Sequence, residues 1–524
     1  MFFNKKLILL GMVVLLALIG QGCTQPRQES NLPEDVYKNL PFDMPRVEQP
    51  SFPDYQVNIT EFGAQSGGKV VNTKAINDAI QAVSAKGGGR VIIPEGLWLT
   101  GPIVLLSNVN LHTEKNALVL FSGDSALYPV VDTVFEGVSA KRCQSPISAV
   151  NADNIAITGF GVFDGAGDSW RPVKKDKMTE RQWKNLLNSG GSVDEAARIW
   201  YPNAGALQAS VLMNGKSHSD TGVTDEEWGK MKTWLRPVMV SIVKSKKVLL
   251  DGITFKNSPN WCIHPLSCEF LTLNNVKVFN PWYSQNGDAL DVESCRNVLI
   301  TNCLFDAGDD AICLKSGKDA DGRRRGEPCE NVIVKNNTVL HGHGGFVVGS
   351  EMSGGVRNVY VADCSFIGTD VGLRFKSTRG RGGVVENIYI DRINMIDIPN
   401  DALIADLYYA VKGGEDAPVP SVSEETPIFK DIHISNVYCN GAGRAVFFNG
   451  LPEMPIQNIS IRNMVVTNAR EGIVINQVAQ VNMENIDIET SDDSVIQLEN
   501  TTGITINGEK YDSISEKRLL TLNK

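Results

Sequence analysis

Basic residues, histidine and long apolar runs are all scarce in this 524-residue chain, and each scarcity excludes a class of function. Acidic residues outnumber basic ones by 60 to 50, which gives a net charge of −10. This balance argues against a nucleic-acid partner, which would need a basic face. Only six histidines are present, and no cysteine pair has zinc-like spacing with histidine partners. We therefore expect no structural metal and no cofactor.

The one pronounced apolar run, Leu7 to Ile19, lies near the N-terminus and is too short for a comfortable membrane span. Two lysines precede it and small residues flank Cys23, as in a bacterial lipoprotein signal. We expect a signal peptide over residues 1–22, a lipid on Cys23 and a polar tether over residues 23–54. The protein would then be exported and lipid-anchored in the membrane, facing the bacterial periplasm or the cell surface. The alternative is ordinary secretion.

Ten cysteines in an exported chain would suggest disulfides. Several of them, including Cys303, Cys364 and Cys439, lie within strand-like repeats, where they are typical of small buried apolar residues. We therefore expect at most a few disulfides.

A short strand phrase, aliphatic-x-aliphatic followed by a polar pair, recurs through most of the chain. Its first aliphatic residue falls at positions 248, 271, 298, 332, 359, 388, 432, 459, 481 and 504, so most intervals are 22 to 29 residues. Repeats of this length with strand alternation indicate a solenoid. Asn and Gly at the bends favour an all-β, right-handed parallel β-helix over residues 55–524, which we expect to be a monomer. An ordinary β-sandwich would not keep one phase over ten repeats.

Helical patterns occur in only two places. Asn72 and Thr73 precede a stretch with Ile76, Ala79, Ile80 and Val83 on one face, which predicts an N-terminal helix that caps the first rung. Residues 168–236 interrupt the repeats and hold two helix-like stretches, 179–188 and 224–235, each opening with a capping box. This helical insertion is interpreted either as a wall over a substrate cleft or as a packed surface element without a role in substrate binding.

Four motifs in a fixed order carry the chemistry: NGDALD at 286–291, GDD at 308–310, GHG at 342–344 and RFK at 374–376. Two carboxyl groups, one donating a proton and one activating water, are what hydrolysis of a glycosidic bond needs. Cations suit a sugar that carries a carboxylate. Asp309 and His343 each lie 11 residues after a repeat start, which places them in one column, one rung apart. Crowded carboxylates should leave one proton shared, with a raised pKa.

This ordered set resembles the polygalacturonases of glycoside hydrolase family 28, whose motifs read NTD, DD, GHG and RIK. The resemblance implies hydrolysis of α-galacturonosidic bonds in polygalacturonan or rhamnogalacturonan-derived oligosaccharides, with inversion. Asp309 would protonate the leaving oxygen, while Asp288 and Asp310 would activate water. His343 would hold the hydrogen-bond network of the acid.

The resemblance also implies a set of substrate contacts. Arg374 and Lys376 would bind the galacturonate carboxylate. Further contacts are expected from the remaining candidates: Asn286 of the first motif, Lys315 after GDD, and Tyr408 or Tyr409, near the place of a family tyrosine. For Lys315 the alternative is a solvated lysine at a strand end. Gly287 and Phe375 depart from the family Thr and Ile, but neither replaced side chain carries the chemistry.

Two other functions compete with the hydrolase. A pectate lyase on the same scaffold would need a calcium site, and a non-catalytic carbohydrate adhesin would not need the three aspartates together. Among hydrolases we expect exo-action, because three elements offer ways to close the groove: the insertion, the basic loop 318–328 and the long interval between positions 388 and 432. Extra cations are expected to bind a terminal sugar: Arg323, Arg324, Arg325, Arg379 and Arg381.

Overall fold

The structure is a computed structural model, and it describes residues 34–410, 418–491 and 496–521. The predicted signal peptide and Cys23 lie outside the described residues. Residues 34–38 fall in a small first unit that holds the 3₁₀ turn η1 (Glu34–Tyr37), and the second unit begins at Asn39. No helix in the described ranges is both long enough and apolar enough to cross a membrane.

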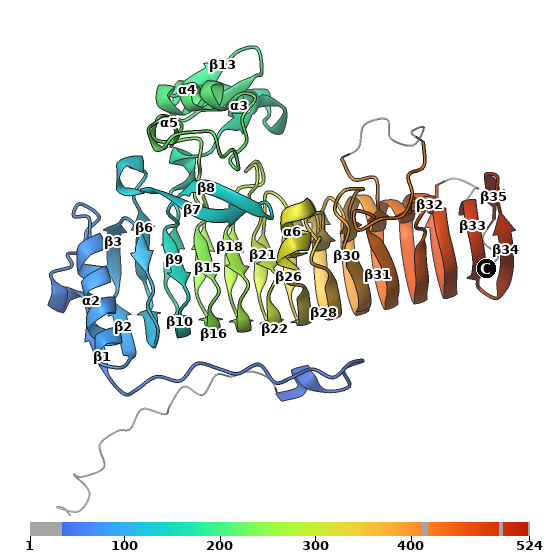
Figure 1. Ribbon diagram of the computed structural model, residues 1–524, viewed down its shortest axis with the longest axis horizontal. Coiled ribbons are helices and arrows are strands. Elements are labelled where there is room, and N and C mark those ends of the chain that lie inside the picture. Colours follow the sequence, from blue (N-terminus) through green and yellow to red (C-terminus); the bar gives the residue numbers. More distant parts are fainter. Residues whose placement is uncertain (1–33, 411–417, 492–495, 522–524) are drawn as a thin grey trace, which may run out of the picture. The chain divides into compact units, whose positions relative to one another are not determined.

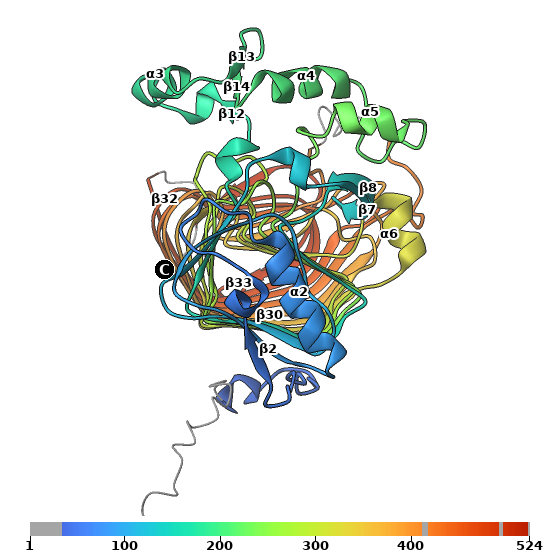
Figure 2. The same cartoon turned by 90° about the vertical axis from the view of Figure 1, so that its left-hand side faces the viewer.

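The second unit is a parallel β-helix, as predicted, in which each rung contributes strands to three columns (Figures 1 and 2). The first column runs through β1 (Gln56–Asn58), β2 (Gly89–Ile93), β5 (Val109–Thr113), β10 (Asp153–Gly159), β16 (Lys246–Asp251), β19 (Glu269–Asn274), β22 (Arg296–Thr301), β25 (Cys329–Lys335) and β28 (Val356–Thr369). The second runs through β3 (Gly96–Thr100), β6 (Ala117–Phe121), β11 (Val162–Asp164), β17 (Thr254–Lys256), β20 (Lys277–Phe279), β23 (Leu304–Asp306) and β26 (Thr338–Gly342), and also ends at β28.

The third column carries the candidate site. It runs through β4 (Ile103–Val104), β9 (Ile147–Val150), β15 (Val240–Val243), β18 (Ile263–Leu266), β21 (Leu290–Glu293), β24 (Ile312–Lys315), β27 (Phe346–Gly349) and β29 (Leu373–Lys376). Longer bent strands follow: β30 (Val384–Asp406), β31 (Ile428–Asn449), β32 (Ile456–Thr490) and β33 (Ile496–Ile506). The antiparallel strands β34 (Glu509–Ile514) and β35 (Arg518–Leu520) pair with β33 and close the last rung.

The repeat phrase forms the first column in the predicted register. Val248 pairs with Leu271, Leu271 with Val298, and the pairing continues rung by rung to Ile459. The residue before the first aliphatic position is often asparagine with a left-handed backbone, which asparagine tolerates better than most residues. The φ values are 53–60° at Asn154, Asn297, Asn331, Asn358, Asn387 and Asn458. Their amides also stack between rungs, as in the 3.1 Å bond from Asn331 Nδ2 to Asn297 Oδ1.

The core explains both the capping helix and the cysteines. In α2 (Thr73–Ala85) the predicted face is buried against the first rungs. The Asn72 side chain bonds loop 65–70 and Leu99 and does not cap the helix. Nine cysteines in the described ranges are free and buried, so they act as the predicted small apolar residues without disulfides.

Part of the segment predicted as a tether is docked on the β-helix. Gln49 Nε2 donates to Thr272 Oγ1 at 2.7 Å, and the Ser51 amide donates to Asn154 Oδ1 at 2.8 Å. Glu48 pairs with Lys247 at 2.7 Å. The prediction rested on polar composition, which does not report contacts made by the backbone and by single side chains.

The insertion lies between β11 and β15 and carries α3 (Glu180–Asn188), α4 (Ala204–Met213) and α5 (Asp225–Lys230), with β12 (Val173–Lys174), β13 (Ser192–Asp194) and β14 (Ile199–Tyr201). Both predicted capping boxes form, at Thr179 and Thr224. Helix α4 was not predicted from the sequence, and α5 ends earlier than predicted. Trp183 and Trp200 pack in a small cluster separate from the main core.

One further element was not anticipated. The hairpin of β7 (Val130–Phe135) and β8 (Val138–Cys143) leaves the rungs ahead of the insertion and reaches the loop that holds α6 (Asp319–Arg325) (Figure 1). There the Lys318 amide donates to the Gly137 carbonyl at 3.1 Å. The hairpin packs Phe135 on Trp261, with ring centroids 4.6 Å apart.

Candidate active site

Strand register brings the four motifs together. Ile312 pairs with Phe346, so Asp309 and His343, each three residues earlier, occupy equivalent places one rung apart, as predicted. Leu290 pairs with Ile312, which aligns Asp288 with Asp310 rather than with Asp309. The third column therefore stacks the carboxylates from two neighbouring rungs.

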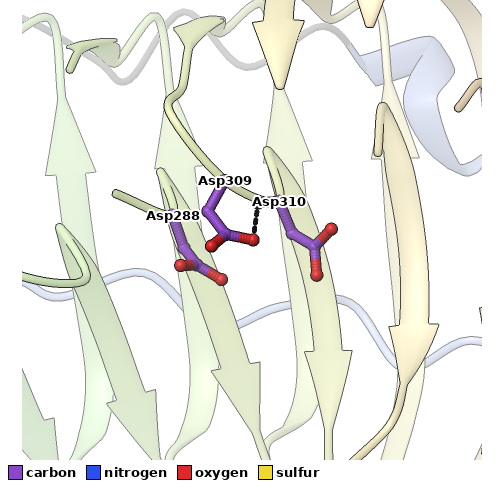
Figure 3. A group of neighbouring side chains, drawn as sticks. All are labelled: Asp288, Asp309 and Asp310. Atoms are coloured by element: carbon purple, nitrogen blue, oxygen red, sulfur yellow. Dashed lines mark hydrogen bonds between the residues drawn. The ribbon is translucent and has the colours of Figure 1, made fainter. Parts of the chain in front are cut away.

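The three aspartates form a compact group, shown in Figure 3. One carboxylate oxygen of each lies within 4.8 Å of the others. Asp309 Oδ1 accepts the Asp310 backbone amide at 3.0 Å, which fixes the bend between them. A Cβ on Gly287 would lie 2.9 Å from the Ser284 backbone carbonyl oxygen, and one on Gly308 would lie 2.5 Å from that of Pro281, both too close. Both bends thus need glycine, which explains the departure from Thr at position 287.

Two cations face the group from the β29 rung. Lys376 Nζ lies 2.6 Å from Asp310 Oδ2, and Arg374 Nη1 lies 3.3 Å from Asp310 Oδ1. Phe375 between them points into the core, so the two cations share the outer face of the strand. Tyr409 stands beside them, with its ring centroid 4.9 Å from Lys376 Nζ and 5.6 Å from Arg374 Cζ. Arg374 and Lys376 therefore offset the negative charge of Asp310.

The pKa values of Asp288 and Asp309 are shifted in opposite directions. Burial, reinforced by the negative charges of Asp291 and Asp309, raises the pKa of Asp288 well above its ordinary value. Burial also opposes ionisation of Asp309, but the hydrogen bond and charge of His343 outweigh it and lower the pKa of Asp309 to about 2. The raised pKa expected in this group thus falls on Asp288, while His343 shifts the pKa of Asp309 in the opposite direction.

His343 is the partner of Asp309. Its Nδ1 lies 3.1 Å from Asp309 Oδ1. That hydrogen bond raises the pKa of His343, against burial, and the negative charges of Asp309 and Asp310 add to the effect. The imidazole therefore holds its proton to a higher pH than an ordinary histidine, beside the carboxylate expected to serve as the acid.

A pH dependence follows from this pair. We expect kcat/KM to fall on the alkaline side, by about tenfold per pH unit, with an apparent pKa above about 6.5, the ordinary value for histidine. The sign follows from the raised pKa, since the proton is present below it and lost as pH rises through it. A pH profile of kcat/KM and a nuclear magnetic resonance titration of His343 should give the same midpoint. An activity loss that begins well below pH 6 would contradict it.

Three of the predicted substrate contacts have other partners in the structure. Lys315 is 3% exposed and pairs with Glu351 at 3.0 Å and Asp291 at 3.5 Å, so it is a buried ion-pair residue and not a solvated lysine at a strand end. Its expected contact with the substrate stays a prediction. Asn286 accepts a hydrogen bond from Arg236 at 3.0 Å. Tyr408 packs against Arg379, whereas Tyr409 faces the two groove cations.

The predicted extra cations are also engaged. Arg379 pairs with Glu453 and Arg381 with Asp319, while Arg323 bonds the 380–381 backbone and Glu425. Arg324 pairs with Asp321, and Arg325 with Glu293. These arginines hold α6 and the neighbouring loops in place, and the expectation that they bind a terminal sugar stays a prediction. The net charge of the chain and the positions of the motifs did not indicate which acidic residues pair with these arginines.

One residue of the insertion reaches the site and was not predicted from the sequence. Lys177 Nζ lies 3.4 Å from His343 Nε2, on the far side of the ring from Asp309. Asp176 and Lys177 line a cavity of about 500 Å³ together with Trp282, His343 and Asp370. No motif marks this contact, since the insertion lies outside the repeats.

Comparison with known proteins identifies the family. The profile described as Glycosyl hydrolases family 28 matches residues 211–442. The crystal structure of a hyperthermoactive exopolygalacturonase from Thermotoga maritima is 31% identical, with a TM-score of 0.73, over 91% of this chain and 97% of that one. The chain belongs to glycosyl hydrolases family 28.

Two curated relatives of this family 28 hydrolase differ in their mode of action. An exo-poly-α-D-galacturonosidase from Dickeya chrysanthemi is 28% identical over 68% of this chain and 58% of the relative. An endo-polygalacturonase from Pectobacterium carotovorum subsp. carotovorum is 27% identical over 68% of this chain and 75% of the relative. The reaction class is polygalacturonase-type hydrolysis of pectic galacturonan, and identity alone does not separate the two modes.

Proposed function

We propose that this family 28 hydrolase removes sugars from the ends of galacturonan chains by an inverting mechanism. The observation that carries the proposal is the group of Asp288, Asp309 and Asp310, with His343 on one side and Lys376 on the other. Release of reducing sugar from polygalacturonate by the purified protein tests it. Unsaturated product that absorbs in the ultraviolet and disappears with a chelator would indicate a lyase, and binding without any release would indicate an adhesin.

The proton of the acid step comes from the His343–Asp309 pair. His343 Nδ1 lies 3.1 Å from Asp309 Oδ1, and each residue favours the charged form of the other: the pKa of His343 is raised and that of Asp309 is lowered. As negative charge develops on the leaving oxygen, the proton passes from Nδ1 through the Asp309 carboxylate to that oxygen. Asp288 and Asp310 hold the attacking water, which loses its proton to whichever of the two is ionised.

Inversion gives the first test of the mechanism. Water held by Asp288 and Asp310 attacks opposite the departing oxygen, without a covalent sugar–enzyme intermediate. We expect the β-anomer as the first product from an α-linked substrate. Proton nuclear magnetic resonance during the first minutes, before mutarotation, measures it. First appearance of the α-anomer would mean retention, and one aspartate would then be a nucleophile.

Exo-action is supported by the elements around the groove. The β7–β8 hairpin is bonded to the α6 loop through Gly137 and Lys318, and the insertion places Lys177 beside His343. Tyr283, next to the cavity residue Trp282, packs in the cluster formed by Trp183 and Trp200 of the insertion. Part of the long 388-to-432 interval, residues 411–417, lies outside the described residues. The exo-acting relatives from Thermotoga maritima and Dickeya chrysanthemi agree with this mode.

The viscosity of polygalacturonate tests the mode of attack. An enzyme that trims ends shortens long chains slowly, so we expect viscosity to fall little while reducing ends accumulate. Mono- or digalacturonate should dominate the early products in chromatography. A rapid early loss of viscosity with mixed oligosaccharides would show endo-cleavage and an open groove.

A further inference from the structure

The Lys177 cavity is separate from the place where Arg374 and Lys376 lie. His343 directs Nδ1 to Asp309 and Nε2 to Lys177, and the two ring nitrogens point away from each other. Beyond Asp309, its neighbour Asp310 contacts Lys376 at 2.6 Å. Cations therefore flank the aspartates on both sides, one from the insertion and two from β29.

Lys177 differs from Arg374 and Lys376, which contact Asp310, because it has no carboxylate partner among the described residues. In the described part of the chain it forms no ion pair with a carboxylate, and its close polar neighbour is the imidazole of His343. Arg379 and Arg381, by contrast, are both in ion pairs. A half-buried ammonium without a carboxylate partner favours an anionic ligand.

The rest of the cavity suits a sugar ring. Its volume of about 500 Å³ falls within the range of ligand pockets, roughly 300–1,000 Å³. Trp282, 47% exposed and packed edge-on against Tyr283, offers an apolar ring face.

Among the described residues, none of the acids that line the cavity forms an ion pair with Lys177. Asp306 bonds His341 at 3.1 Å, and Asp370 lies 3.7 Å from His343 Nε2. Asp176 is exposed and can accept hydrogen bonds from sugar hydroxyls. A uronate with its hydroxyls toward the aspartates and its carboxylate toward Lys177 therefore fits this lining.

We propose that Lys177 binds the carboxylate of the sugar on one side of the scissile bond, while Arg374 and Lys376 bind that of the sugar on the other side. Trp282 stacks on the sugar held by Lys177. The inference rests on the proposed function and names its substrate. Both sugars flanking the cleaved bond are galacturonates, so the substrate is a homogalacturonan chain rather than the alternating galacturonate–rhamnose backbone.

The test compares Lys177→Met with Lys174→Met, an exposed lysine of the same insertion outside the cavity. With trigalacturonate we expect KM to rise roughly 10- to 100-fold in Lys177→Met, the effect of one lost charge-assisted hydrogen bond. Lys174→Met should match the wild type, and Lys177→Arg should recover most of the loss. The wild type should have a higher kcat/KM for trigalacturonate than for a rhamnogalacturonan oligosaccharide. In Lys177→Met the ratio of the two kcat/KM values should be smaller.

Other outcomes separate the alternatives. Equal KM values for Lys177→Met and Lys174→Met would overturn the inference. An equal loss of kcat/KM on both substrates, together with a shift of the alkaline limb of the pH profile, would also overturn it. Lys177 would then act only through its effect on the charge of His343. If the wild type releases nothing from polygalacturonate, the proposed function fails, and calorimetric binding of trigalacturonate to the two variants still decides the subsite.

Discussion

Replacing Asp309 with asparagine is expected to lower kcat by about 10²–10⁴-fold, the usual contribution of a general acid. The amide cannot relay the proton of His343 to the leaving oxygen. Its oxygen can still accept the Asp310 backbone amide, so the bend that holds the group should survive. Reducing-sugar release gives the rate, while thermal unfolding and trigalacturonate binding should stay close to the wild type.

The companion variant Asp288→Asn decides which carboxyl donates the proton. Burial and the negative charges of Asp291 and Asp309 raise the pKa of Asp288, which makes this carboxyl the other candidate for the proton donor. If Asp309→Asn keeps more than a tenth of wild-type turnover while Asp288→Asn is inactive, then Asp288 is the acid. If both variants lose activity but only Asp309→Asn also loses the alkaline limb set by His343, the assignment given above holds.

The second large effect is expected from Lys376→Met. Lys376 and Asp310 are 8% and 2% exposed at the side chain and lie 2.6 Å apart. The Asp310 carboxylate raises the pKa of Lys376 above its usual range, against the effect of burial. Truncating one partner of a buried charged pair costs about 2–5 kcal/mol, or roughly 30- to 4,000-fold in kcat/KM if all of it falls on the reaction.

Lys430→Met is the matched control. Lys430 pairs with Glu386 at 2.9 Å but is partly exposed, and exposed pairs contribute only about 0–1 kcal/mol. Its activity should stay near that of the wild type. A change of less than threefold in Lys376→Met would show that Arg374 alone supplies the cation at Asp310 and at the substrate carboxylate.

The fold was predictable because the alternation of apolar and polar residues along the chain indicates which side chains are buried. Each repeat phrase places its aliphatic residues in the core, and a phase kept from Val248 to Ile459 can be satisfied only by stacked rungs. The column shared by Asp309 and His343 follows from the same phase. The β7–β8 hairpin has no such signal, because it is a two-stranded element outside the repeats.

The environment of single charges was not predictable. Lys315 occupies a strand position that faces the groove, yet Glu351 from a later rung neutralises it in the interior. The arginines near α6 are paired by acids far away in sequence, such as Glu425 and Glu453. Only Lys177 remained without a carboxylate partner among the described cations at the cavity, and its position depends on how the insertion folds.

The pairing of the third column has a consequence for altering this enzyme. The turn between β21 and β22 spans residues 294–295, whereas the equivalent turn after β24 spans 316–328 and contains α6. Despite this difference, β21, β24 and β27 remain in register. Loop length is therefore decoupled from the spacing of the reacting groups. Turns taken from other β-helix enzymes could replace the turn at residues 316–328 to change the sugar preference. The distances between the catalytic carboxylates would stay as they are.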